Sequence, residues 1–423
     1  MEENILHEPL QSAYRSQHST ETALIRIQND ILCDLDNKRG VVLVLLDLSA
    51  AFDTIDHSVL KNRLQQRIGI VDVALKWFES YHHERTQVVR VNDSTSSSIT
   101  LPFGVPQGSV IGAEEYKLYT IPLGEIIRRH GLRFHFYADD GQLHVSFVLK
   151  NKEDLQTALD KISACTREIK LWMTTNFLKL NDEKTEVMVI TPARKSHEIN
   201  VENVNIGNTT VPTSKSAKNI GVTFDSKMKL QEHITHTCRV CFMHLRKIAS
   251  IRRFITTESC ESLVSALITS RLDYANSVLY GLPKCQIKRL QRVQNMAARI
   301  VRNVGKFEHV TPIMYELHWL PLHERIEFKI IIMTFKILHG CAPGYLEQLL
   351  EIYSPKRQLR SSTNCYQLTV PRYNTRMYGY RSFSVAAPTL WNRLPNRIRS
   401  ITEFQTFKKL LKTHLFKRAY SIQ

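Results

Sequence analysis

The spacing of hydrophobic residues predicts alternating helices and strands in the first half of this chain. Leu24, Ile27 and Ile31 recur at helical spacing behind an N-cap at Ser19 or Thr20. Residues 41–46 are an uninterrupted apolar run, which is typical of a strand buried on both faces. The pattern also predicts helices near 58–68, after 110 and over about 155–172, hairpins with turns near 92–94 and 139–141, and a strand over 184–190.

Beyond about residue 228 the spacing becomes helical. Basic and apolar residues interleave over 244–254, and Arg289, Arg292 and Arg299 follow one face of a segment whose opposite face is apolar. Residues 328–336 are apolar between two lysines, which predicts a buried helix. We therefore expect an α+β fold in which a mixed N-terminal region precedes an all-helical one and a mainly helical C-terminal region.

Three carboxylates follow or separate the predicted strands. Asp47 comes directly after the apolar run, and Asp139 and Asp140 lie between two strands with Gly141 behind them. A single aspartate after a strand is more often a turn or helix-cap residue. Carboxylates in such places are costly without a nearby cation, and three of them favour an all-oxygen site for Mg²⁺, with Mn²⁺ as an alternative. Two such ions would serve phosphoryl transfer.

The segments around these carboxylates resemble, as an ordered set, the motifs of reverse transcriptases. The resemblance is to the enzymes of LINE-type (non-LTR) retrotransposons, in the group related to jockey and the chicken repeats, and it covers nearly the whole chain. The matching segments are 11–15 and 18–23 (fingers), 45–57 (motif A), 103–112 (motif B), 136–140 (motif C), 178–181 and 184–186 (motif D), and 219–222 with Asp225 (after the palm).

This resemblance implies a right-hand polymerase. Residues 1–226 would form the palm with partial fingers, residues 227–305 a helical thumb, and residues 306–423 a basic C-terminal region. Within the palm, Asp47, Asp139 and Asp140 would bind the metal.

The resemblance also implies roles for five further residues. Phe52 matches the steric gate that excludes a ribose 2′-OH, with an ordinary core aromatic as the alternative. Gln107 and Gly108 would form a turn that lets the backbone approach nucleotide and template. Arg15 matches the residue that contacts the triphosphate, with a surface arginine as the alternative. Lys184 matches the lysine that protonates the departing pyrophosphate, with a solvated helix-end lysine as the alternative.

Two features depart from the family pattern. Glu114 and Glu115 stand where many relatives have apolar residues, so a core-facing position would damage the helix after motif B, whereas a solvent-facing one would not. In addition, Met1 begins only about a dozen residues before Arg15. From this we expect incomplete fingers, no endonuclease and no DNA nicking by this chain.

The net charge of +17 is unevenly distributed. Residues 1–225 hold 25 Lys+Arg and 29 Asp+Glu, whereas residues 226–423 hold 32 and 11. Lysine and arginine contacts to phosphates give sequence-independent affinity, so we expect the C-terminal half to hold nucleic acid. Basic surfaces also serve solubility, which is the alternative.

Two side-chain groups of the C-terminal half leave alternatives open. The aromatics and arginines between 319 and 393 could bind single-stranded RNA or form the core of a small helical domain. Cys238 and Cys241, with histidines nearby, have a zinc-like spacing, but the segment reads as one continuous helix, which disfavours a metal site.

No apolar run reaches the ~18 residues of a transmembrane helix, no signal region opens the chain, and the eight cysteines lack a disulfide framework. We therefore expect an intracellular protein of the cytoplasm or nucleus that is not secreted and has no membrane partner.

Two functions are compatible with the sequence. In the first, an RNA-directed DNA polymerase uses an RNA template, a DNA primer and deoxynucleoside triphosphates, and the primer 3′-OH attacks the α-phosphate of a nucleotide held with Mg²⁺ at Asp47 and Asp139. A separate endonuclease or a full-length element protein would be a further partner. The alternative is a catalytically inactive, truncated retroelement remnant that binds nucleic acid.

Overall fold

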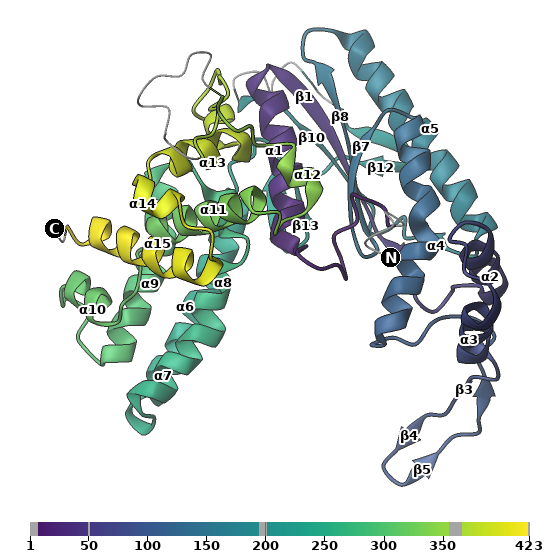
Figure 1. Cartoon of the computed structure of the whole chain (residues 1–423), viewed down its shortest axis with the longest axis horizontal. Helices are drawn as coiled ribbons and strands as arrows, with labels where there is room; N and C mark the ends of the chain where they lie inside the picture. The colour runs from purple at the N-terminus through teal and green to yellow at the C-terminus, as the bar shows by residue number, and fades with distance from the viewer. Residues whose placement is uncertain (1–6, 50, 194–198, 200, 355–365, 422–423) are drawn as a thin grey trace. The chain divides into compact units, whose positions relative to one another are not determined.

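The computed structural model describes residues 7–49, 51–193, 199, 201–354 and 366–421. The chain forms two compact units (Figure 1). Unit 1 comprises residues 1–16, 40–189 and 195–214, and unit 2 comprises residues 17–39, 190–194 and 215–423. Each unit therefore contains segments from distant parts of the sequence.

Unit 1 is built on a four-stranded sheet in the order β10-β1-β8-β7. The strands are β1 (Arg39–Leu46), β7 (Arg133–Tyr137), β8 (Asp140–Val148) and β10 (Glu186–Ile190). The side chains from Val41 to Val44 are fully buried, so the apolar run predicted as a strand covered on both faces is confirmed. Strands β7 and β8 form the predicted hairpin, with Tyr137 paired to Asp140.

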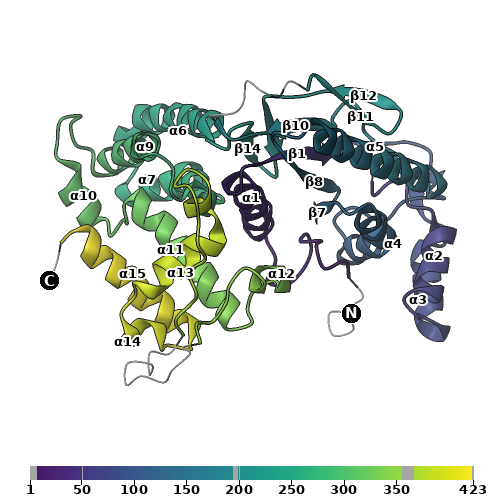
Figure 2. The same cartoon turned by 90° about the horizontal axis from the view of Figure 1, so that it is seen from above.

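Two long helices, α4 and α5, pack along one side of this sheet (Figure 2). Ser109 caps the first by accepting from the Gly112 N–H at 2.9 Å, and Asn151 caps the second. The helices of unit 1 are α2 (His57–Gln66), α3 (Asp72–His82), α4 (Val110–Arg129) and α5 (Lys152–Thr175).

Short strand pairs complete unit 1. A long hairpin made of two successive strand pairs extends from the end of α3 (Figure 1) and turns at Asn92, whose φ is 53°. Its strands are β3 (Thr86–Gln87), β4 (Arg90–Val91), β5 (Ser94–Thr95) and β6 (Ile99–Thr100). The other pairs are β2 (Leu48–Ser49) with β9 (Lys179–Leu180), and β11 (Asn203–Ile206) with β12 (Thr209–Pro212).

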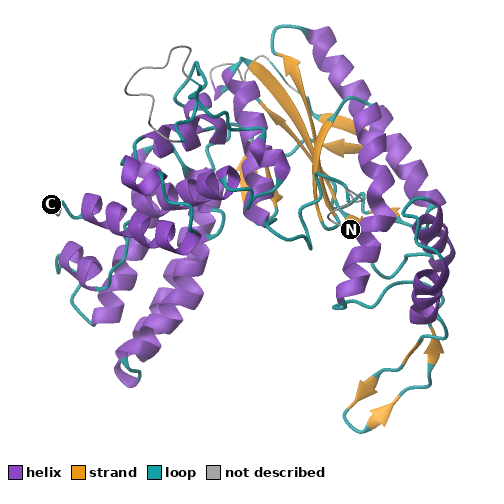
Figure 3. Cartoon of the chain, viewed as in Figure 1, coloured by secondary structure: helices purple, strands orange, loops and turns teal. Residues whose placement is uncertain are grey.

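Unit 2 is mostly helical (Figure 3). Ser19 begins α1 with a reciprocal cap to Thr22, as the N-cap pattern predicts. The elements are α1 (Thr20–Asp36), β13 (Ser216–Asn219), β14 (Val222–Asp225), α6 (Gln231–Ile251), α7 (Thr257–Val264), α8 (Ser270–Asp273), α9 (Lys284–Arg302), α10 (Val310–Glu316), α11 (Leu322–Leu338), α12 (Gly344–Glu347), α13 (Phe383–Asn392), α14 (Asn396–Arg399) and α15 (Phe404–Ala419).

Helix packing buries the apolar faces of unit 2. Helix α6 packs against α9, and α11 packs against α13 and α15. The predicted buried helix over 328–336 lies inside α11, and α6 is one uninterrupted helix through Cys238 and Cys241. The fold therefore mixes helices and strands, as predicted. In the part of the chain that the structure describes, every helix is too short or too polar to cross a bilayer.

Candidate active site

The three predicted carboxylates lie at one end of the four-stranded sheet. Asp47 directly follows β1, Asp139 lies in the turn between β7 and β8, and Asp140 is the first residue of β8. A Cβ built on Gly141 would lie 3.5 Å from the Leu46 Cβ. The beginning of β8 therefore lies beside the end of β1, which brings carboxylates 92 and 93 positions apart in the sequence into one region.

Burial and mutual repulsion raise the pKa values of both hairpin carboxyls. The pKa of Asp140 rises to about 6, first because of burial and then because of the charges of Asp139 and Asp47. The pKa of Asp139 is also raised, chiefly by burial. This region therefore carries more negative charge than its surroundings compensate, which a bound cation would offset.

Lys184 supplies the positive charge nearest to Asp47. Its Nζ lies 3.2 Å from the Asp47 Oδ2. The lysine side chain is 68% exposed, so water weakens this ion pair. Asn181 fixes Asp47 by donating its backbone N–H to the Asp47 carbonyl oxygen at 2.9 Å. Lys184 lies in the turn before β10. The helix-end part of the alternative is therefore wrong, whereas its solvated side chain agrees with that alternative.

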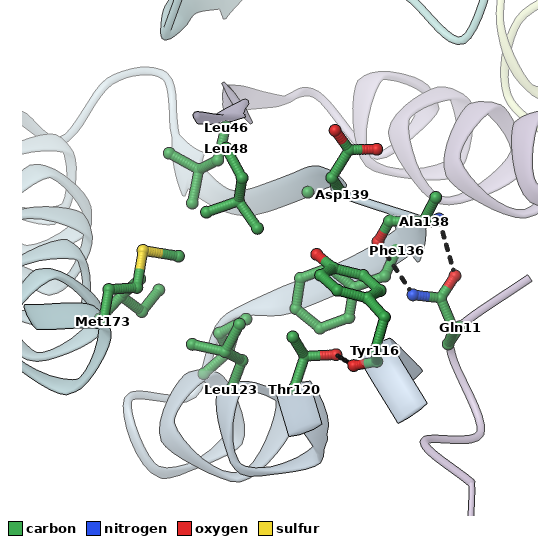
Figure 4. A pocket seen from close by; sticks show the side chains of 13 residues that line it. Gln11, Leu46, Leu48, Tyr116, Thr120, Leu123, Phe136, Ala138, Asp139 and Met173 are labelled. Carbon is green, nitrogen blue, oxygen red and sulfur yellow. Dashed lines mark hydrogen bonds between the residues drawn. The ribbon is translucent and has the colours of Figure 1, made fainter. Parts of the chain in front are cut away.

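The side-chain amide of Gln11 forms hydrogen bonds with the backbone of the hairpin turn. Its Nε2 donates to the Ala138 carbonyl oxygen at 3.0 Å, and its Oε1 accepts from the Ala138 N–H at 2.9 Å (Figure 4). Ala138 has a φ of 55°, a left-handed conformation that a non-glycine residue adopts at some cost. The two bonds thus stabilise the strained backbone immediately before Asp139.

An apolar recess lies beneath this turn. Leu46, Tyr116, Leu123 and Met173 line it, and the Asp139 carboxylate points away from these side chains (Figure 4). Tyr116 is buried, and burial together with the Asp139 charge raises its pKa well above the usual range. The hairpin turn therefore rests on a packed apolar support.

A larger pocket of about 710 Å³ opens beside Asp139. Phe52, Gln107 and Gly108 line it together with Asp139, so it brings together four of the eight predicted site residues. Its volume falls within the range of small-molecule sites in proteins. Arg15 is not among the described residues that line this pocket.

Phe52 forms one wall of the pocket through aromatic packing. Its ring stacks on Tyr116, with centroids 4.9 Å apart and planes 28° apart. Tyr14 meets the Phe52 ring edge-on at 6.5 Å. Phe52 packs partly against the core of unit 1 and also faces the pocket. This packing fits both an ordinary core aromatic and a steric gate, so the gate stays a prediction.

Backbone bonds hold the turn that carries Gln107 against the loop that carries Phe52. The Val105 N–H donates to the Phe52 carbonyl oxygen at 2.9 Å, and the Gln107 Nε2 donates to the Asp53 Oδ1 at 2.9 Å. Gly104 has a φ of 83°, and a Cβ there would lie 2.9 Å from the Asp53 carbonyl oxygen. Only glycine fits this close approach.

A polar chain connects this turn to α3 and α4. The Gly104 carbonyl oxygen lies 2.8 Å from the His57 Nε2 and accepts from Arg85 at 2.8 Å. The His57 ring stacks on His82 at 4.4 Å. His82 Nε2 lies 2.8 Å from the Oε1 of Glu115, which is fully buried on α4. Burial chiefly lowers the pKa of His57, which favours the neutral ring.

Both glutamates that depart from the family pattern are thus paired. Glu115 faces the core with His82 as its partner, and Glu114 accepts from Lys117 Nζ at 2.7 Å. Helix α4 continues unbroken from Val110 to Arg129. The expectation that a core-facing glutamate would damage this helix is therefore wrong, because a partner from α3 offsets the cost of burying it.

The environment of Arg15 differs from its predicted role. Its Nη1 donates to the carbonyl oxygens of Glu8 and Gln11 at 3.0 and 3.1 Å. The arginine therefore stabilises the segment from which Gln11 reaches the hairpin. The sequence alone did not predict the structural roles of Gln11, Tyr116 and His82, because the residues that they contact lie far away in the chain.

Among the described residues, no three His, Cys, Asp or Glu side chains lie close enough together to hold a metal ion unaided. This includes the segment of Cys238 and Cys241, both of which are buried in α6. Burial raises the pKa values of both thiols, which keeps them in the protonated form.

Comparison with known proteins gives consistent results. A family model described as "Reverse transcriptase (RNA-dependent DNA polymerase)" matches residues 2–224. The chain is 26% identical to the "Probable RNA-directed DNA polymerase from transposon X-element" of Drosophila melanogaster, over 75% of this chain and 34% of that protein. It is 24% identical to the "RNA-directed DNA polymerase from mobile element jockey" of the same species, over 70% and 32%. The chain thus spans about a third of the length of these relatives.

A solved structure of telomerase from Candida albicans, in complex with a fragment of telomeric RNA, is also similar. The likeness covers 75% of this chain and 51% of that one, at 11% identity and a TM-score of 0.28. This likeness is too low to support an argument. The family model, in contrast, covers more than half of the residues, and this chain belongs to the reverse transcriptase (RNA-dependent DNA polymerase) family.

Proposed function

We propose that this chain is the RNA-directed DNA polymerase of a non-LTR retrotransposon of the jockey-related group. It would extend a DNA primer on an RNA template with deoxynucleoside triphosphates. The observation that carries this proposal is the pocket in which Phe52, Gln107 and Gly108 surround Asp139, in a family whose relatives are named as RNA-directed DNA polymerases.

Asp47, Asp139 and Asp140 would hold Mg²⁺, or Mn²⁺ in its place. Burial, and after it the neighbouring carboxylates, raises the pKa values of the hairpin carboxyls, and a divalent cation would stabilise their ionised forms. Carboxylates offer the hard oxygen ligands that Mg²⁺ prefers. Because the three do not converge closely enough to hold an ion unaided, substrate phosphates and water would complete its coordination. When bound, the metal would activate the attacking hydroxyl and stabilise the leaving oxygen.

The remaining residues would position the nucleotide. Phe52, stiffened by its stack on Tyr116, would present its ring to the sugar and exclude a 2′-OH. Gln107 and Gly108 would line the base and template side. Lys184, beside Asp47, would donate the proton to the departing pyrophosphate.

Arg15 would contact the triphosphate only after leaving the two carbonyl oxygens that it now binds.

In this proposal the palm and partial fingers occupy residues 1–226, the thumb residues 227–305, and a basic C-terminal region residues 306–423. The protein would work inside the cell, in the cytoplasm or nucleus, where RNA templates are available. A separate endonuclease or a full-length element protein would be a further partner.

Primer extension on an RNA template with Mg²⁺ tests the proposal. We expect extension by the full chain, its loss in Asp139→Asn, and its retention in Asp160→Asn, which removes the same charge from an exposed position on α5. Extension that persists in Asp139→Asn would show that the carboxylate assignment is wrong. Salt-sensitive RNA binding without any extension would instead identify an inactive remnant.

A further inference from the structure

A second pocket lies wholly within unit 2, far along the chain from the carboxylate site. It has a volume of about 630 Å³. Its walls come from the loop 279–283, the first turns of α9 and α11, the segment around Tyr380, and the C-terminal end of α13. Pockets of this volume commonly hold ligands in proteins.

Four cations line this pocket: Lys284, Lys288, Arg376 and Arg393. All four are exposed. Among the residues that the structure describes, no carboxylate lies within 4 Å of any of them. The pocket therefore has positive charge that the protein itself leaves uncompensated.

The one carboxylate in the lining is already engaged. Glu327 is buried, accepts a hydrogen bond from Arg418, and lies 3.3 Å from the His323 Nε2. Arg418 and His323 therefore offset the charge of Glu327, which does not neutralise the four cations. In addition, α9 starts at Lys284 without a side-chain cap, so its first N–H groups add to the attraction for an anion.

Aromatic rings form the side of the pocket next to Arg376. Its guanidinium lies 5.7 Å from the Tyr380 ring centroid. The Tyr280 hydroxyl donates to the Tyr380 hydroxyl at 2.9 Å, and Tyr373, which is 42% exposed, lies 5.8 Å from Tyr380. Trp391, Tyr378 and Arg381 belong instead to the buried core. The core alternative is therefore confirmed for Trp391 and Tyr378.

Buried contacts fix the segment that carries Arg376 and Tyr380. Arg381 is buried and donates to the Met228 carbonyl oxygen at 2.7 Å. Asp36 accepts from the backbone N–H groups of Asn374 and Thr375, both at 2.7 Å. The cationic and aromatic groups are thus held in place before any ligand arrives.

We propose that this pocket binds a segment of single-stranded nucleic acid. Several cations beside an uncapped helix start suit successive phosphates, and the ring of Tyr380, which lines the pocket and is partly exposed, suits stacking of a base. A recess of this size admits one strand but not a double helix, whose phosphates lie on a rod much wider than the pocket. This binding would hold a strand on unit 2 whether or not unit 1 catalyses.

Fluorescence anisotropy with a labelled single-stranded RNA oligonucleotide tests the proposal on the full chain. The test variant changes Lys284, Lys288 and Arg376 to glutamine. The control changes Lys408, Lys409 and Lys412, exposed on α15, to glutamine, so that the net charge of the two variants is equal. We expect at least tenfold weaker binding by the test variant and a slope of log K against log salt that is smaller by about 2.

Equal losses in both variants would show diffuse charge attraction and overturn the proposal. Should the triple variant fold poorly by circular dichroism, the single change Arg393→Gln at an exposed position gives the same comparison against Lys412→Gln. Competition with single-stranded DNA, uridine monophosphate and inorganic phosphate shows whether the pocket recognises a nucleic-acid strand or only a phosphate group. We expect the strand to compete best, and equal competition by inorganic phosphate would contradict the proposal. A blunt RNA duplex that competes as well as the single strand would contradict the single-strand assignment.

Discussion

The two units differ in how they use charge. Unit 1 holds 19 Lys+Arg and 24 Asp+Glu, and unit 2 holds 38 and 16. In unit 1 several charged side chains are buried and paired, as in Glu115 with His82 and Lys117 with Glu114. In unit 2 the pocket cations are exposed and unpaired among the described residues. Charge in unit 1 thus shapes a site, whereas the pocket cations of unit 2 are available to a partner.

This difference predicts that chemistry and affinity can be separated by mutation. The largest effect should come from Asp47→Asn, with extension falling by about 10³-fold or more because a metal ligand is lost. Affinity for single-stranded RNA should change less than about twofold, since it depends on unit 2. Extension rates and anisotropy on the same preparation check both. A parallel loss of RNA binding in Asp47→Asn would contradict the assignment of RNA affinity to unit 2.

The buried pair in unit 1 should control the stability of that unit alone. We expect Glu115→Ala to lower its free energy of unfolding by about 3 kcal/mol, because His82 then loses its partner inside the core. Glu125→Ala, an exposed change on the same helix, should cost less than about 1 kcal/mol. Urea unfolding followed by hydrogen exchange distinguishes unit 1 from unit 2. Equal costs for the two changes would show that the buried pair is unimportant.

Nucleotide selectivity should also reside in unit 1. We expect Phe52→Val to increase the use of ribonucleotides relative to deoxynucleotides by about tenfold or more, because the ring that faces the pocket is removed. The ratio of kcat/KM values for the two nucleotide types measures this. Phe103→Val, at a half-exposed position outside the pocket lining, is the control. An unchanged ratio in Phe52→Val would leave the ring with a packing role only.

The smallest effect should be the share of the loss of stability in acid that His57 causes in unit 1. His233 of unit 2, whose pKa burial lowers to about 4, causes a separate share. The pKa of His57 is lowered in the folded state, mainly by burial, so the folded protein binds fewer protons there than the unfolded chain. Its stabilising contribution is present above about pH 6.5 and is lost as the pH falls from there through the lowered pKa. Melting curves between pH 7.5 and 5.5 should show this, with a weaker dependence in His57→Gln.

Local pattern was enough to predict the elements that are long and regular. Helix α1 was predicted from its N-cap and apolar spacing, and β1 from an unbroken apolar run. Helix α3 was missed although Ala74, Phe78 and Tyr81 recur along it at helical spacing; Leu75 is its only buried residue. The strands β11 to β14 were missed because each has only four residues.

The site could be predicted only where a motif carried it. The resemblance named Asp139 and Phe52, which line the pocket, and Asp47, which lies at the end of β1 outside the pocket lining. It could not find Gln11 or His82, because the contacts of Gln11 with Ala138 and of His82 with Glu115 join residues 127 and 33 positions apart. Long-range pairing of this kind leaves no periodic signal in a single sequence.

The clamp of Gln11 on Ala138 has a consequence for how the protein is assembled. A hairpin of two adjacent strands forms from local contacts. Its strained turn at Ala138, however, is stabilised by Gln11, which lies 127 positions earlier in the chain. During synthesis Gln11 emerges from the ribosome long before the turn, so its hydrogen bonds to Ala138 can form only after the hairpin has been made. A fragment beginning after Ser16 would therefore form the strands with a mobile turn, and a separate peptide of residues 7–16 could restore its order in trans.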